Sequence, residues 1–418
     1  MKIPGFSASS RRLIRRRFAA LVGRQRTNFR QGLAALLVSS VGDLAAGLAL
    51  GFMTGTLDRL PGLIVLVPAA IGMRGNIFGA LGSRLGTAIH TGEFEGRVEK
   101  RNLAGQNVLA SAALTLYVSI ALAVLAKEVA RLFNVETIPL THYIAVSVVG
   151  GLLSSLVILA ITLWVATMSV RRGWDMDNVA APVVTAAGDL VTLPALWLTT
   201  FLLPVGRLPE FVALASVVGA ILTTIYQLRQ TDLRIFRRVI RGSLTILILA
   251  GLVDVVAGLT IEKRLESFLV YPGLLVLIPP FLEDAGALGG ILSARLSSKL
   301  HLGSIPPQAI PSRRSWEDIL LTYILGVPVF FFVGLSGTIV SHAVGLETPG
   351  LLQMLSLTML AGAIATTGAV FVAYYTAMIS FRFGFDPDNY GIPVVTSSMD
   401  LIGAGALILS MVWLGIAG

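Results

Sequence analysis

The sequence of 418 residues has no cysteine, only four histidines and few charged residues. Without cysteine, the chain can form neither disulfides nor thiolate metal sites, and it has no thiol nucleophile. The histidines show no metal-ligand spacing, which argues against a zinc site. Charged residues make up 13% of the chain and hydrophobic residues 55%, whereas soluble domains carry roughly 25% charged residues. The composition therefore predicts a membrane protein.

Apolar runs of about 20 residues, long enough to cross a bilayer core, recur along the whole sequence. We count about 11 such runs and expect an all-α polytopic membrane protein without a soluble domain. Because the basic residues lie between the apolar runs, the net charge of +9 is better explained by membrane orientation than by nucleic-acid binding. No nucleic-acid partner is expected.

A 15-residue motif occurs twice. It reads DMDNVAAPVVTAAGD from Asp175 to Asp189 and DPDNYGIPVVTSSMD from Asp386 to Asp400. Asp43 and Asp254 recur at the same offset of 211 positions, as does much of the Pro- and Gly-rich run that follows each of them. A constant offset without an insertion indicates a duplicated unit.

The duplication predicts the domain organisation. We expect a basic cytoplasmic arm over 1–30, a first five-helix repeat over 31–205, a linker helix with a basic segment over 206–241, and a second five-helix repeat over 242–418. The linker helix makes the number of helices before the second repeat even, so the repeats should be parallel, with a pseudo-twofold axis along the membrane normal. The distribution of Arg and Lys in the loops predicts a cytoplasmic N-terminus and an external C-terminus.

The repeated motif places a polar stripe on the fifth helix of each repeat. Positions i, i+4, i+7 and i+11 share one face of a helix, and at this spacing lie Asn178, Thr185 and Asp189 in the first repeat and Asn389, Thr396 and Asp400 in the second. If the stripes face each other across the axis, Asp189 and Asp400 come close together. Two such carboxylates need a cation or protons to compensate their charge.

The second helix of each repeat offers a facing surface of small residues that includes Asn76. In the second copy Gly72 is replaced by Glu283 and Met73 by Asp284, while Arg74 is replaced by alanine. This change suggests that Glu283 or Asp284 pairs with Arg74 across the axis. Asp43 and Asp254 are further intramembrane acids. Structural alternatives are helix capping for the leading Asp residues and close helix packing for the small residues.

These side chains offer carboxylate, hydroxyl and amide oxygens and no soft ligands, which suits a hard, partly hydrated divalent cation such as Mg²⁺. The candidate cation ligands are Asp189, Asp400, Asp43, Asp254, Thr185, Thr396, Asn178, Asn389, Asn76 and Glu283. No catalytic residue and no cofactor is expected.

The segments PGLIVLVPAAIGMRGN, DNVAAPVVTAAGDLVTL and DPDNYGIPVVTSSMDL resemble the membrane domain of the MgtE and solute carrier family 41 magnesium transporters. The resemblance covers nearly everything after residue 30. It implies five-helix units, used as a homodimer in MgtE and fused in tandem in the solute carrier branch, so this chain would act as a monomeric pseudo-dimer in the cell membrane. It also implies a Mg²⁺ pathway on the axis lined by the second and fifth helices, with Asp189 and Asp400 at the cation site. The short N-terminal arm has no room for the cytosolic sensor domains of bacterial MgtE.

Two other functions compete with this one. A proton- or sodium-coupled carrier of another small cation would also need buried acids. An intramembrane aspartyl protease would use two acids, and AAGD at 186–189 with PAL at 194–196 resembles its signatures. In that family the two signatures lie on different helices, whereas here five residues separate Asp189 from Pro194, which argues against an enzyme.

Overall fold

The computed structural model describes residues 26–94, 98–99, 102–172, 176–230, 232–384 and 391–416, and every regular element in these ranges is helical. Ten of the described helices are long and apolar enough to cross a membrane. A further helix, α7 (Met176–Thr200), has 25 residues and corresponds by sequence to α14, which is one of the ten. The prediction of an all-α polytopic membrane protein is confirmed.

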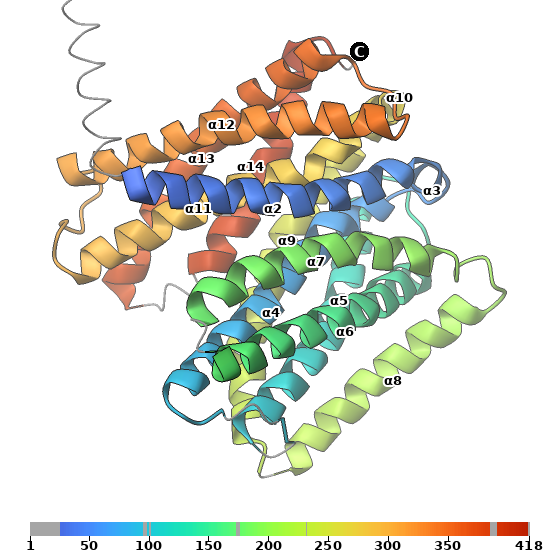
Figure 1. Ribbon diagram of the computed structural model, residues 1–418. Helices are drawn as coiled ribbons and strands as arrows, with labels where there is room; N and C mark the ends of the chain where they lie inside the picture. The colour runs from blue at the N-terminus through green and yellow to red at the C-terminus, as the bar shows by residue number, and fades with distance from the viewer. Residues whose placement is uncertain are drawn as a thin grey trace, which may run out of the picture.

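The helices of the second half repeat those of the first at the offset of 211 positions (Figure 1). In pairs, they are α2 (Arg26–Phe52) with α9 (Arg234–Glu262), α3 (Thr54–Arg59) with α10 (Leu265–Val270), η1 and α4 (Leu63–Leu66 and Val67–His90) with α11 (Gly273–His301), α5 (Leu103–Leu132) with α12 (Arg313–Ala343), α6 (Leu140–Arg172) with α13 (Leu351–Phe383), and α7 with α14 (Ile392–Trp413). The predicted linker helix is α8 (Leu208–Arg229).

α8 has no counterpart in the second half. It packs on α5 and α6 and lies at the periphery, where Figure 1 shows it beside the first repeat. Most of its surface is exposed, including the apolar side chains Phe211, Leu214 and Leu222. An apolar helix with this much exposed surface is suited to face lipid tails.

The first helices of the two repeats are exchanged. α2 packs against α11 and α12 of the second repeat, and α9 packs against α4 and α5 of the first. Polar contacts accompany both exchanges. Ser40 on α2 donates a hydrogen bond of 2.7 Å to Asp284 Oδ2 on α11, and the Gly62 amide donates one of 3.0 Å to Glu262 Oε1 at the end of α9. The halves related by sequence are therefore interlocked, not packed as two separate bodies.

Two glycines allow the exchanged helices to approach the backbone of their neighbours. A Cβ added at Gly47 of α2 would lie closer than 3.0 Å to the Val276 carbonyl oxygen, and one added at Gly258 of α9 would lie equally close to that of Val65. Both glycines and both valines correspond at the repeat offset. The Val276 carbonyl has no intrahelical donor four residues later, because that residue, Pro280, has no N–H. The chain is thus held at two equivalent points by backbone-to-backbone contact.

We expect Gly258→Ala to destabilise the protein by about 1–3 kcal/mol, because the new methyl group overpacks a rigid carbonyl and not a flexible side chain. The measurement is the apparent melting temperature in detergent. Gly405→Ala in α14 is the matched control, since nothing lies within 4 Å of a Cβ there. An equal melting temperature for both variants would contradict the interlock.

Candidate functional site

Four aspartates meet in the interior, two from each repeat. Asp43 on α2 faces Asp189 on α7, and Asp254 on α9 faces Asp400 on α14. The side chains of Asp43, Asp189 and Asp254 are at most 2% exposed, whereas Asp400 is half-buried. The sequence argument paired Asp189 with Asp400. In the structure, each of them directly faces the first-helix aspartate of its own repeat.

No ion pair among the described residues neutralises these carboxyl groups. Neither oxygen of Asp43 has a hydrogen bond of regular geometry there, and the same holds for Asp189 Oδ2 and Asp254 Oδ1. The hydroxyls of Ser39 and Ser397 are the uncharged polar neighbours of Asp43 and Asp254. An ionised carboxylate only accepts hydrogen bonds, so two of them in contact repel each other unless they share a proton or a cation. The arrangement therefore has unused oxygen ligands at a place where an unpaired charge is costly.

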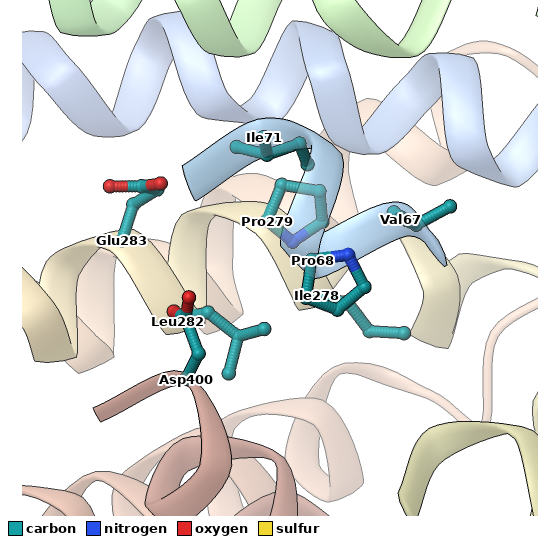
Figure 2. A pocket seen from close by; sticks show the side chains of 8 residues that line it. All are labelled: Val67, Pro68, Ile71, Ile278, Pro279, Leu282, Glu283 and Asp400. Atoms are coloured by element: carbon teal, nitrogen blue, oxygen red, sulfur yellow. The ribbon is translucent and has the colours of Figure 1, made fainter. Parts of the chain in front are cut away.

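Glu283 on α11 interacts electrostatically with all four aspartates of the two pairs. Together with Asp400 it lines one side of a pocket (Figure 2). The rest of the pocket wall consists of three apolar pairs related by the repeat, namely Val67 with Ile278, Pro68 with Pro279, and Ile71 with Leu282. The pocket thus lies between equivalent turns of α4 and α11, with apolar residues on one side and carboxylates on the other.

The residues that precede the pocket in η1 and at the start of α11 are buried, so the pocket is closed on that side. All of η1 and residues 274–278 of α11 are buried. Beyond it, a stripe of partly accessible positions runs along each helix, from Gly72 through Asn76 and Gly79 on α4, and from Glu283 through Gly290 on α11. These positions share one helix face, and an added Cβ at Gly79 or Gly290 would meet nothing within 4 Å. The stripe is therefore a candidate access route to the carboxylates from the C-terminal ends of α4 and α11.

The remaining predicted ligands have mixed placements. Thr396 is half-buried, and its hydroxyl donates to the Ile392 carbonyl at 3.1 Å. Asn178 and Thr185 belong to α7, but their side chains lie outside the described part of the structure, and Asn389 lies outside the described residues altogether. For these residues the ligand role stays a prediction.

The predicted pairing of Arg74 with Glu283 or Asp284 is wrong. Arg74 is fully buried against α6, where its Nε donates to Ser154 Oγ at 3.1 Å, and its Nη1 donates to the Ala70 carbonyl at 3.1 Å. Successive residues are about 100° apart around a helix. Arg74 thus lies on the side of α4 opposite to Gly72 and the pocket, and Asp284 is turned from Glu283 toward Ser40 of α2.

Within the described residues, no three histidine or acidic side chains converge closely enough to hold a bare metal ion. Two carboxylates, Glu283 and Asp400, line the pocket, and the other three lie near these two. Such spacing suits a cation that retains part of its water shell, as Mg²⁺ does when only one or two carboxylates bind it directly.

Comparison with known proteins gives a consistent result. The model of the family described as "MgtE: Divalent cation transporter" matches residues 67–199 and 278–410. Solute carrier family 41 member 2 of Xenopus laevis is 28% identical over 93% of this chain and 72% of its own length, and the Homo sapiens member 2 is 27% identical over 93% and 70%. Member 3 of Rattus norvegicus is 23% identical over 90% and 84%.

Among solved structures, the crystal structure of the eukaryotic MATE transporter AtDTX14 aligns with 92% of this chain and 96% of its own. The identity is 11% and the TM-score is 0.33, too low to support an argument about the fold.

The accessible stripe predicts which positions water-soluble reagents reach. The native chain has no cysteine, so single cysteines can be labelled without background. We expect Gly79→Cys and Gly290→Cys to react with a charged maleimide in open membrane fragments, and Val65→Cys and Val276→Cys, which are 0% exposed, to stay unlabelled. Labelling at the two valine positions as fast as at the glycine positions would show that the pocket is not closed on its apolar side.

Proposed function

The chain belongs to the MgtE divalent cation transporter family, and we propose that it carries Mg²⁺ through the space between α4, α7, α11 and α14. The observation that carries the proposal is the cluster of Asp43, Asp189, Asp254, Asp400 and Glu283 between the two repeats. Among the described residues, both oxygens of Asp43 and one each of Asp189 and Asp254 have no hydrogen-bond partner. Intramembrane acids are costly and typically mark ion pathways.

The chemistry of the cluster supports Mg²⁺ over softer ions. The charged ligands are carboxylates alone, and the sequence offers no thiolate. Copper and zinc favour sulfur or imidazole ligands, whereas Mg²⁺ favours oxygen and gives up its water reluctantly. A pathway wide enough for a partly hydrated ion, with carboxylates spread around it, fits this preference.

The route we propose is open at one end. The paired apolar residues of the pocket separate the carboxylates from the N-terminal ends of α4 and α11, while the stripe through Gly79 and Gly290 connects them with the opposite ends. With the orientation predicted from the loop charges, that open end is cytoplasmic. This conformation would then exchange ions with the cytoplasm. Because the apolar side of the pocket includes Ile71 and Leu282, transport to the other side of the membrane would require these two residues to separate.

One chain supplies both halves of the proposed pathway, so the functional unit would be a monomer that acts as a pseudo-dimer. The interlocked first helices support this, because each half takes one of its central aspartates from a helix that packs on the other half. Protons or sodium ions could be coupled to Mg²⁺ movement, and the flux measurement below distinguishes coupled exchange from a simple channel.

We expect Asp189→Asn and Asp400→Asn each to reduce Mg²⁺ uptake by about 10-fold or more, because each removes a negative charge that would bind the cation in a water-poor site. The measurement is Mg²⁺ flux into liposomes loaded with a Mg²⁺-sensitive dye, with and without sodium or proton gradients. The control is Asp58→Asn, because Asp58 is exposed at the surface in α3. Full flux in a folded Asp189→Asn/Asp400→Asn double variant would refute the proposal.

A further inference from the structure

The two halves of the acidic cluster are not equivalent. The aspartates correspond in pairs, Asp43 with Asp254 and Asp189 with Asp400, but the second helices do not match at the level of the cluster. The first repeat has Gly72 where the second has Glu283. The cluster therefore contains a single carboxylate from the second helices, at one of two equivalent positions.

The space at Gly72 is occupied by carboxylates from the other repeat. A Cβ added at Gly72 would lie 3.1 Å from Asp254 Oδ2 and 3.7 Å from Asp400 Oδ2. Gly72 is thus in direct contact with one aspartate pair. The equivalent position in the second repeat carries the Glu283 side chain, whose carboxylate interacts with Asp43 and Asp254, one aspartate from each pair.

Glu283 has no basic partner in the described part of the chain. The ion pairs there join Arg131 with Glu128 and Lys299 with Asp318, and Arg74, one turn from the pocket on α4, faces α6 instead. Its carboxylate instead lines the pocket next to Asp400 (Figure 2). A half-buried carboxylate that interacts with four others is unfavourable unless protons or a cation compensate the charge.

We propose that Glu283 is the shared cation ligand of the pathway, a role that rests on the proposed function and extends it. The cation would contact Glu283 whichever aspartate pair it also contacts, so Glu283 would set the affinity for the transported divalent ion. Since positions 72 and 283 correspond at the repeat offset and both lie next to the aspartates, one carboxylate at either position should serve, whereas none or two should not.

The experiment moves this carboxylate from one repeat to the other. Four variants are compared with the wild type in Mg²⁺ uptake by liposomes: Glu283→Gln, Glu283→Gly, Gly72→Glu and the exchange Gly72→Glu/Glu283→Gly. We expect Glu283→Gln and Glu283→Gly to raise the Mg²⁺ concentration for half-maximal uptake by about 10–100-fold, the range typical when a group that supports a metal site is lost. Gly72→Glu alone should lose uptake, because a sixth carboxylate would lie against Asp254 and Asp400. The exchange should recover at least about 10-fold of the loss in Glu283→Gly.

Binding is followed separately from transport through the rise in melting temperature on adding Mg²⁺, because a ligand that binds the folded state stabilises it by an amount that grows with the logarithm of one plus the ratio of ligand concentration to Kd. The Mg²⁺ concentration needed for that rise should increase in Glu283→Gln and return toward the wild-type value in the exchange variant. Glu266→Gln, on the exposed first turn of α10, is the charge-matched control and should match the wild type in both measurements.

The outcomes are distinct. Unchanged half-maximal concentrations in Glu283→Gln overturn the inference, and so does an exchange variant that folds but performs no better than Glu283→Gly. If the exchange variant does not fold, Glu283→Gln decides through uptake and Mg²⁺-dependent stabilisation. If the wild type itself neither moves Mg²⁺ nor is stabilised by it, the proposed function fails, and not the role of Glu283 alone.

Discussion

The close contact between two glycines and two carbonyl oxygens determines where the acids lie. Gly47 and Gly258 follow Asp43 and Asp254 by one helical turn, so each glycine lies on the same helix face as the aspartate before it. Where the glycine lets α2 or α9 touch the backbone of the opposite repeat, the aspartate is brought to the centre of the molecule. The exchange of first helices is thus both a packing feature and the reason why four aspartates meet.

The cluster that results is electrostatically incomplete. Five carboxyl groups lie close together, several of their oxygens have no hydrogen-bond partner among the described residues, and the buried guanidinium of Arg74 points into α6. A soluble protein would place water around such groups, but a membrane interior offers little. The same closely spaced carboxyl groups make the empty cluster energetically costly and attract a divalent ion. A change that lowers this cost by removing a carboxyl group therefore also weakens the attraction for the ion.

Much of the fold follows from the sequence. The lengths of the apolar runs predicted the helices, and the offset of 211 positions predicted which helices correspond. In the structure, α6 and α13 begin and end at equivalent residues. The sequence could not reveal the exchange of first helices, because α2 is apolar around most of its surface and either repeat could accept it. α2 also packs on α7 of its own repeat, and this contact makes Asp43 the neighbour of Asp189.

The site was predicted less completely than the fold. Helical spacing predicted Asp189, Asp400 and Glu283 as candidate ligands. In the structure their carboxyl groups interact with one another, and their role as ligands stays a proposal. The same spacing, applied to Arg74, would have shown that it lies opposite to Gly72 on α4, and the suggested ion pair ignored this. The side chains of Asn178 and Thr185 and the residue Asn389 lie outside what the structure describes, so their part in the site still rests on the repeated motif.

Joining the two units in one chain has a consequence for how such a pathway can change. In an assembly of two identical chains, every substitution appears on both sides of the axis, and the charge of the central cluster changes in steps of two. Here a substitution such as the one that distinguishes Glu283 from Gly72 appears once. The fused chain can therefore adjust its central charge by a single unit and can hold an odd number of carboxylates, which a symmetric pair of chains cannot.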